Sequence, residues 1–400
     1  MSFIFLSPYY QAFYYNIIHI VIIKNQLKSG AFIQIVVPIN VQTNINMYKL
    51  SDYMKRGGIM LNNRLFPSNK KLASVMLYTT DRCNSQCRHC YIWEKTPKNN
   101  MSFNQIKSLL KSPAICKTTT IGLEGGEFML HPEAGLIMEY LHHNHPNFDL
   151  LSNCVHTKKL ISLVGIYPPK RLYISLDGKP ETHDYMRRVK GLYQKVLYVI
   201  NELKDTVPLS VMFTLTPFNT LDDLKHVASI CKENQVDMRI GIYSNMEYFQ
   251  TKEPALKNNT SLNYRIDDIP AEVKDFTENY DFMLLYHLFR KNEVSLTCNS
   301  VKDNIVIYPN GDIPLCQHKQ IILGNINDEP LEAILGKKST IMYHKTYHKC
   351  NGCWINFHRK YDIVLYRNME KVLPKGIIRK LFGTYSWTSD PAAKYKDLFQ

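Results

Sequence analysis

The sequence predicts an α/β fold built on a parallel sheet, followed by a small cysteine-rich part. Between about residues 72 and 243, apolar runs of strand length alternate with segments of helical pattern, which is typical of βαβ units. Near residue 290 this alternation stops and a second group of cysteines follows. The 400 residues are 45% apolar and 21% charged, which is enough to bury a large core and unlike a disordered chain.

Six strands are expected in the alternating region, at residues 74–79, 118–123, 149–152, 171–176, 208–216 and 237–243. Helices are expected between them at 103–112, 132–143, 157–164, 191–204 and 220–234, with a further long helix at about 270–291. Two helices begin with capping boxes, Ser102 with Gln105 and Thr220 with Asp223. Ligands of parallel β/α folds bind at the carboxyl ends of the strands, so the residues that follow each strand are the candidate site.

The loop after the first expected strand contains Cys83, Cys87 and Cys90. Soft thiolate ligands select zinc or iron–sulfur sites. Three thiolates are one fewer than a closed tetrahedral metal or a fully coordinated four-iron cluster needs, so a cubane held here keeps one iron open. A structural zinc knuckle would need a fourth ligand nearby, and His89 lies between two of the cysteines.

This CX3CX2C spacing resembles that of the radical S-adenosylmethionine (SAM) superfamily, and the resemblance extends over roughly residues 72–357. It implies that the six β/α units form a partial (β/α)6 TIM-type barrel. It also implies that Cys83, Cys87 and Cys90 hold a [4Fe–4S] cluster whose open iron is chelated by SAM. In the family, one electron from the cluster cleaves SAM to methionine and a 5′-deoxyadenosyl radical.

Motifs after the next three strands resemble the family's SAM-binding motifs. Gly125-Gly126-Glu127 resembles the GGE motif that binds the SAM amino group, and Ser175-Leu176-Asp177-Gly178 with His183–Arg187 resembles the SLDG…HDxxR signature. In Ser152-Asn153-Cys154, the cysteine departs from the usual glycine. The resemblance implies SAM contacts by Gly125, Gly126, Glu127, Ser152, Asn153, Ser175 and Arg187, the last at the SAM carboxylate. Asn219, after the fifth strand, is a further candidate, and no residue is assigned a catalytic role.

The second cysteine group comprises Cys298, Cys316, Cys350 and Cys353. Residues 304–316 read as a hairpin with Pro309–Asp312 as its turn, and four cysteines around a hairpin and a CX2C turn converge readily on one metal. The group resembles the SPASM extension or its short form, twitch. Since no cysteine follows Cys353, the short form with one auxiliary [4Fe–4S] cluster is expected. A structural zinc ribbon has a similar ligand pattern and stays open as an alternative. Cys116, Cys154 and Cys231 are expected to be ordinary thiols.

The net charge of +14 belongs to the ends of the chain. Residues 1–70 carry seven basic side chains against Asp52, residues 337–400 carry thirteen against four acidic ones, and the middle is nearly neutral. No basic groove around the chemistry and no clear nucleic-acid site are therefore expected. The expected domains are an N-terminal extension (1–70), the barrel (71–292), the auxiliary-cluster domain (293–358) and a basic tail (359–400).

Ten cysteines without a convincing secretory signal favour a reducing, cytoplasmic location. The uncharged stretch 3–23 has three interpretations: over-extended translation upstream of Met47, Met54 or Met60, a membrane anchor, or a packed extension. The basic and apolar tail can lie on an anionic membrane surface, pack over the barrel mouth, or bind a partner or RNA.

The expected function is hydrogen abstraction from an unidentified substrate, which can be a peptide, a cofactor precursor, or a lipid or sugar intermediate. A flavodoxin or ferredoxin is the expected electron donor. Peptide maturases of the family often carry an N-terminal winged domain, which residues 1–70 do not resemble, so the peptide option is weakened without being closed. The alternative from another class is a non-catalytic module that binds zinc at both cysteine groups.

Overall fold

The computed structural model describes residues 19–26, 32–39, 50–257, 298–300, 302–350, 353, 374, 376–377 and 380. The chain divides into two compact units, Met1–Asn44 and Ile45–Gln400. In the first, β1 (His19–Gln26) and β2 (Phe32–Ile39) form an antiparallel hairpin. Among the described residues, none of the helices combines the length and apolarity needed to span a membrane. The helix expected at 270–291 and nearly all of the tail lie outside the described residues.

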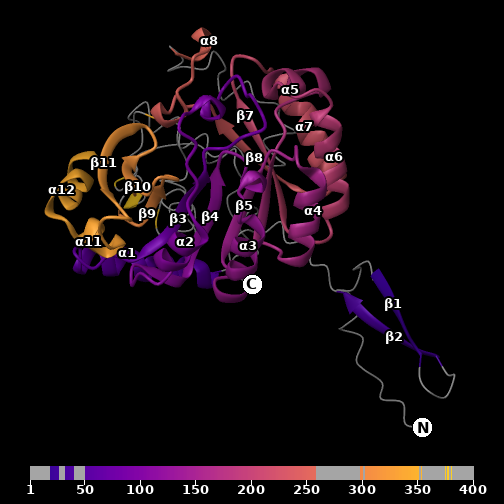
Figure 1. Ribbon diagram of the computed structural model, residues 1–400, viewed down its shortest axis with the longest axis horizontal. Coiled ribbons are helices and arrows are strands. Elements are labelled where there is room, and N and C mark those ends of the chain that lie inside the picture. The colour runs from indigo at the N-terminus through magenta and orange to yellow at the C-terminus, as the bar shows by residue number, and fades with distance from the viewer. Residues whose placement is uncertain are drawn as a thin grey trace. The chain divides into compact units, whose positions relative to one another are not determined.

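The second unit is built on a seven-stranded parallel sheet that forms a half-barrel (Figure 1). The strand order is β8-β7-β6-β5-β4-β3-β9. The strands are β3 (Leu72–Thr80), β4 (Ile115–Gly125), β5 (Phe148–Ser152), β6 (Arg171–Ser175), β7 (Leu209–Leu215), β8 (Asp237–Ile242) and β9 (Asn304–Ile307). The first six agree with the expected strands to within three residues at each end, which confirms the predicted α/β barrel-type fold.

Helices connect the strands as the alternating pattern predicts. The expected ones are α2 (Phe103–Leu109), α3 (Ala134–Asn144), α4 (Thr157–Ile166), α6 (Leu192–Leu203) and α7 (Leu221–Glu233). Both predicted capping boxes are formed, at Ser102 and at Thr220. Further elements are α1 (Leu50–Leu65), α5 (Pro180–Arg187), α8 (Pro254–Lys257), α11 (Leu331–Gly336), α12 (Lys338–Tyr347) and the short η2 (Ile92–Glu94), η3 (Phe128–Leu130) and η4 (Glu247–Phe249).

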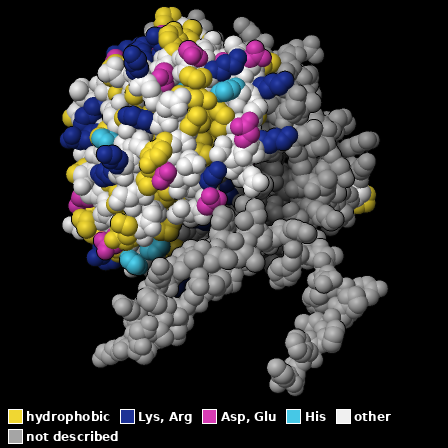
Figure 2. Space-filling view, turned by 90° about the vertical axis from the view of Figure 1, so that its right-hand side faces the viewer, with side chains coloured by type: hydrophobic (Ala, Val, Ile, Leu, Met, Phe, Trp, Pro, Cys, Tyr) yellow, Lys and Arg dark blue, Asp and Glu magenta, His cyan; other side chains and the backbone are white. Residues whose placement is uncertain are grey.

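The main hydrophobic core lies between the sheet and the helices that cover it. On β5, Phe148 and Leu150 are buried in this core, whereas Asp149 and Leu151 alternate with them and are partly exposed. This period-two pattern places one face of β5 against helices. On the side of the molecule that faces the viewer in Figure 2, basic and acidic side chains are interspersed, as on an ordinary solvated surface.

The last strand of the sheet corrects the hairpin predicted at residues 304–316. β9 pairs with β3 in parallel, from Ser74 opposite Asn304 to Leu77 opposite Ile307, so it closes one edge of the half-barrel. All four of its residues are buried, which is typical of a parallel strand covered on both faces. The turn itself is present, since the backbone amide of Tyr308 donates to the carbonyl oxygen of Asp312 at 2.9 Å.

The antiparallel hairpin that does form lies one strand further along the chain. It consists of β10 (Asp312–Cys316) and β11 (Lys319–Asn325). Cys316 is opposite Lys319, next to the turn of this hairpin. A small antiparallel hairpin that carries a cysteine is therefore confirmed, but it is formed by β10 and β11 and not by the segment at residues 304–316.

Helix α1 packs against the start of β3 through a buried asparagine. The side-chain amide of Asn63 donates to the carbonyl oxygens of Lys71 at 2.8 Å and Lys302 at 2.9 Å. Its carbonyl oxygen accepts the backbone amide of Lys71 at 2.7 Å. Ile59 of the same helix is buried against Ala73. Helix α1 therefore belongs structurally to the second unit.

A chain that begins at Met47 lacks the first unit, Met1–Asn44, which is a compact unit of its own. We therefore expect this shortened chain to unfold at the same denaturant concentration as the full chain. Replacing Asn63 by Ala in that shortened chain should lower the free energy of unfolding by about 1–3 kcal/mol, because buried backbone groups lose their partners. Urea unfolding followed by circular dichroism measures both. A lower midpoint for the Met47 chain than for the full chain would contradict the first expectation.

Candidate active site

The cysteine loop follows β3 and is fixed from two sides. On one side, the backbone amide of Arg88 donates to the carbonyl oxygen of Met186 at 2.9 Å. The hydroxyl of Ser85 donates to the backbone carbonyl oxygen of Arg187 at 2.8 Å. On the other side, the amide of Tyr91 donates to the carbonyl oxygen of Phe249 at 2.9 Å. The loop that carries the three cysteines is therefore docked on the last turn of α5 and on η4.

The three thiols of this loop influence one another. Burial raises the pKa of Cys90 to about 12, and the neighbouring thiol of Cys87 acts in the same direction. Burial and both neighbouring thiols likewise raise the pKa of Cys83. The sulfurs of Cys83 and Cys90 ionise together in this environment only when a cation compensates their charge. The donor set therefore fits an iron–sulfur cluster, whose irons supply that positive charge.

The two glycines after β4 allow the cysteine loop to pass close by. Gly125 has φ +115°, which favours glycine, and a β-carbon there would lie 2.8 Å from the carbonyl oxygen of Thr80. A β-carbon on Gly126 would overlap the carbonyl oxygen of Arg82. The backbone amides of Gly126 and Glu127 donate to the carbonyls of Thr80 and Arg82, both at 2.8 Å. The glycines thus let the end of β4 hold the start of the loop.

Glu127 connects the ends of β4 and β5. Its carboxylate is buried and accepts hydrogen bonds from the Ser152 hydroxyl at 2.9 Å and from the backbone amides of Met129 at 3.1 Å and Asn153 at 2.7 Å. Burial raises its pKa, and these hydrogen bonds oppose that rise. A carboxylate has about four acceptor positions, so one remains for a further donor such as an ammonium group.

Asn153 extends this arrangement to the cysteine loop. Its side-chain amide donates to Asn84 Oδ1 at 2.9 Å and lies 3.8 Å from the sulfur of Cys83. The next residue, Cys154, has φ +62°, a backbone conformation that favours glycine, and is fully buried. The cysteine at this place therefore adopts a conformation that a side chain disfavours.

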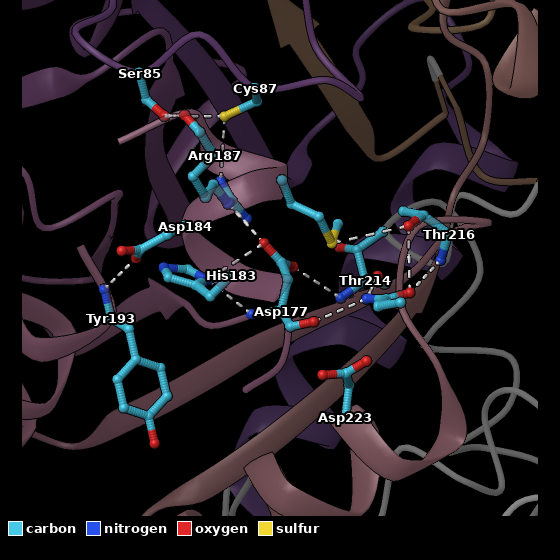
Figure 3. A network of polar contacts seen from close by, with 12 residues as sticks. Ser85, Cys87, Asp177, His183, Asp184, Arg187, Tyr193, Thr214, Thr216 and Asp223 are labelled. Atoms are coloured by element: carbon cyan, nitrogen blue, oxygen red, sulfur yellow. Dashed lines mark hydrogen bonds and ion pairs between the residues drawn. The ribbon is translucent and has the colours of Figure 1, made fainter. Parts of the chain in front are cut away.

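Arg187 lies at the centre of a buried polar network (Figure 3). Its Nε donates to Asp177 Oδ2 at 2.6 Å, and its Nη1 lies 3.8 Å from the sulfur of Cys87. The hydroxyl of Ser85 is 3.1 Å from the same sulfur. Burial raises the pKa of the Asp177 carboxyl, but the Arg187 charge outweighs it, so this pKa is lowered and Asp177 stays ionised. Arg187 is thus a fixed cation beside the candidate cluster.

Sequence reasoning left Asp177 and His183 without roles, although both lie within the motifs that it quoted. The backbone amide of Asp177 donates to His183 Nδ1 at 3.1 Å, and its carboxylate accepts the amide of Thr214 at 3.3 Å. Burial lowers the pKa of His183 to about 4, so the ring is neutral. Asn219 donates to the carbonyl oxygens of Asp177 and Thr214, so it fixes the loop after β7. Ser175 lies buried at the end of β6.

An aromatic cluster beside the cysteine loop was not foreseen. Tyr78 of β3 lies near the rings of Tyr248, Phe249 and Tyr308, and the rings of Tyr248 and Tyr308 stack with centroids 3.9 Å apart. Cys83 and Cys90 pack against this cluster. Its members come from three segments far apart in the chain, so no sequence spacing indicated it.

The second cysteine group is brought together by the fold. Cys298, Cys316, Cys350 and Cys353 all line one pocket, with His318 and His344 beside them. Burial raises the pKa of Cys316 to about 11, and the thiols of Cys353 and Cys298 act in the same direction. Four cysteines that line one pocket fit a metal centre that takes all four as thiolates.

Replacing Gly126 by Ala is expected to displace the cysteine loop, because the new methyl group overlaps the Arg82 carbonyl oxygen. Such overpacking costs about 1–3 kcal/mol. Anaerobic reconstitution should then load less iron at this loop, as measured by iron analysis. Gly165→Ala in α4 is the matched control, since nothing lies within 4 Å of the added carbon. Full iron loading in the Gly126 variant would contradict the tight approach.

Comparison with known proteins adds two family matches. The model of the radical SAM superfamily matches residues 77–231, and that of SPASM, an iron–sulfur cluster-binding domain, matches residues 298–354. The antilisterial bacteriocin subtilosin biosynthesis protein AlbA of Bacillus subtilis (strain 168) is 24% identical over 314 residues, 70% of this chain and 68% of that protein. Fe-coproporphyrin III synthase of Methanosarcina barkeri (strain Fusaro / DSM 804) is 25% identical over 162 residues, 39% of this chain but only 40% of that protein.

The fold is also similar to a solved structure. Streptococcus suis SuiB bound to its precursor peptide SuiA has a TM-score of 0.56 and 12% identity, with 77% of this chain and 75% of that chain covered. Another SuiB structure contains S-adenosylmethionine. The family matches assign a SAM-binding [4Fe–4S] cluster to the barrel and auxiliary iron–sulfur chemistry to the C-terminal part. This chain is therefore a radical SAM enzyme with a C-terminal SPASM domain.

Proposed function

We propose that this enzyme cleaves SAM reductively and abstracts a hydrogen atom from a peptide substrate. Cys83, Cys87 and Cys90 would hold the SAM-binding cluster. Cys298, Cys316, Cys350 and Cys353 would hold one auxiliary [4Fe–4S] cluster. When bound, the first cluster and SAM supply one-electron cleavage that yields a 5′-deoxyadenosyl radical for hydrogen abstraction. The chain's own residues position SAM, hold the loop and exclude water from it.

The geometry supports a SAM site at the carboxyl edge of the sheet. Glu127 keeps one acceptor position beside its three hydrogen bonds, which suits the SAM ammonium group. Arg187 uses two of its five N–H donors on Asp177 and Cys87, which leaves donors for the SAM carboxylate. Ser152, Asn153 and Ser175 lie buried at the same strand ends, and Gly125 and Gly126 keep the backbone close to the loop.

The observation that carries the peptide proposal is the match to AlbA over 70% of the chain, because AlbA serves bacteriocin biosynthesis. The similar fold of SuiB, solved with a precursor peptide, supports it. A pocket beside the cysteine loop has walls suited to peptide side chains, since it combines aromatic rings with charged groups. Its lining includes Asp81, Lys95, Tyr248, Tyr308 and Asp312.

A tetrapyrrole-type small molecule is the second candidate, favoured by the match to Fe-coproporphyrin III synthase. That match spans about two fifths of either protein. The peptide candidate therefore has the stronger support.

Elemental analysis tests the two cysteine groups. Three and four cysteines predict two cubanes, or about eight irons per chain after anaerobic reconstitution. The double variant Cys350→Ala, Cys353→Ala should keep about half of the iron, and Cys116→Ala, which lies in neither group, should keep all of it. One tightly held zinc with about four irons in the parent would instead indicate a structural zinc site at the second group.

Substrate assays test the activity. With SAM and dithionite, the parent should form 5′-deoxyadenosine, and Cys83→Ala should form none because its cluster is lost. A precursor peptide encoded beside the gene should increase 5′-deoxyadenosine formation and change in mass, as followed by mass spectrometry. If a tetrapyrrole increases 5′-deoxyadenosine formation and no such peptide does, the substrate belongs to the small-molecule class. SAM cleavage by Cys83→Ala would contradict the cluster assignment itself.

A further inference from the structure

The pocket beside the cysteine loop is formed by segments that lead to both cysteine groups. Its volume is about 280 Å³. Asp81 lines it just after β3, two positions before Cys83, and Asp312 lines it at the start of β10, the strand that ends at Cys316. Its wall also includes Tyr248, which belongs to the aromatic cluster against which Cys83 packs. A group bound in this pocket therefore lies beside the loop that carries the three cysteines.

One side of the pocket already holds a cation of the chain itself. The ammonium group of Lys95 lies 3.4 Å from the ring centroid of Tyr248 and 3.7 Å from Asp81 Oδ1. The hydroxyl of Tyr248 donates to the same Asp81 oxygen at 2.5 Å, and Asn99 Nδ2 donates to Asp81 Oδ2 at 3.1 Å. The Asp81 carboxylate is therefore paired and hydrogen-bonded. This side also shows that an aromatic ring and a carboxylate together hold an ammonium group at this site.

The other side of the pocket has the same two components without a cation. Glu247 and Asp312 line it, and neither forms an ion pair with the described residues. The Asp312 carboxylate accepts hydrogen bonds from the uncharged side-chain amides of Asn310 at 2.6 Å and Asn325 at 2.9 Å. Burial raises the pKa of Tyr308, and the charges of Glu247 and Asp312 act in the same direction, so both carboxylates lie near this ring.

The lining of the pocket has more negative than positive charge. It contains three carboxylates and one ammonium group, those of Asp81, Glu247, Asp312 and Lys95. Two further basic side chains, Arg82 and Lys98, are close in the chain but line no part of the pocket. Lys98 Nζ donates to backbone carbonyl oxygens, at 3.3 Å from that of Asp81. Carboxylates beside aromatic rings attract a positively charged group and repel an anionic one.

We propose that the side of the pocket formed by Glu247, Asp312 and Tyr308 binds a positively charged side chain, a lysine or an arginine, of the peptide substrate. The inference rests on the proposed function, since it takes the substrate to be a peptide, and it adds which side chain the site selects. The charged group lies between the two carboxylates, and its alkyl part packs against the tyrosine ring. No bond forms or breaks in this step, which holds the neighbouring residues of the peptide beside the cysteine loop.

The test uses the reconstituted holoenzyme and the precursor peptide encoded beside the gene. Each lysine and arginine of the peptide is replaced in turn by glutamine. The peptide concentration that gives half-maximal 5′-deoxyadenosine formation is then measured with SAM and dithionite. Glu247→Gln removes one carboxylate and no described side-chain hydrogen bond, and the double variant Glu247→Gln, Asp312→Asn removes both carboxylates. Glu139→Gln, an exposed position on α3, is the matched control.

One of the peptide replacements should raise this concentration about tenfold with the parent enzyme. For the unchanged peptide, Glu247→Gln should raise it about threefold and the double variant about tenfold, because each carboxylate contributes part of the attraction. The double variant should respond equally to the replaced and the unchanged peptide, since the two changes remove the same interaction. Glu139→Gln should match the parent. The peptide replacements act on the parent enzyme, so this comparison does not depend on how the variants fold.

Three results would overturn the inference and leave the proposed function standing. The first is a parent enzyme that responds to the peptide but equally to every lysine and arginine replacement. The second is a double variant that still discriminates the replaced from the unchanged peptide, and the third is an active precursor peptide that contains neither residue. A parent enzyme whose 5′-deoxyadenosine formation no peptide increases would overturn the peptide proposal itself, and this inference with it.

Discussion

The buried ion pair between Arg187 and Asp177 is the interaction on which the candidate site depends. It joins the end of α5 to the loop after β6, and the backbone carbonyls beside Arg187 hold the cysteine loop. Removing one partner of such a pair typically costs about 3–5 kcal/mol, because the other charge stays buried without compensation. The pair therefore makes the position of the three cysteines a property of the barrel, and the loop does not depend on a metal alone to set its shape.

The sequence predicted the elements whose causes are local. Capping at Ser102 and Thr220, apolar runs in six strands and cysteine spacing all act over a few residues, and the structure agrees with them. Helix α5 was not predicted, because it has no side-chain cap and its start signal is only a proline in its first turn. The predicted pairing of β9 was wrong for a different reason. An apolar run before a turn fits a hairpin and a buried parallel strand equally well, and only its pairing with β3 decides.

The candidate site divides in the same way. The cysteines and the glycine motifs were recognisable in the sequence. The aromatic cluster around Tyr78, the ion pairs of Glu253 with two arginines and the ion pair of Asp177 with Arg187 arise instead from contacts between segments that the sequence does not place together. One such contact links the two cysteine groups. Gln317, next to Cys316, donates to the hydroxyl of Tyr78 at 2.7 Å, and Tyr78 lies in the cluster against which Cys90 packs. The side chains of Gln317 and Tyr78 thus link the two cysteine groups by direct contacts.

The pairing of β3 with β9 has a consequence for how the chain folds. Ser74 and Asn304 are 230 positions apart, so β3 can pair with β9 only after the chain between them has been synthesised. Contacts of such separation form late, since the intervening chain must be ordered before they stabilise it. The strand that leads into the cysteine loop would remain an unpaired edge until then, exposed to mispairing with other chains. We therefore expect cluster insertion to follow synthesis of β9, with termination before β9 yielding an aggregation-prone fragment and no partially active barrel.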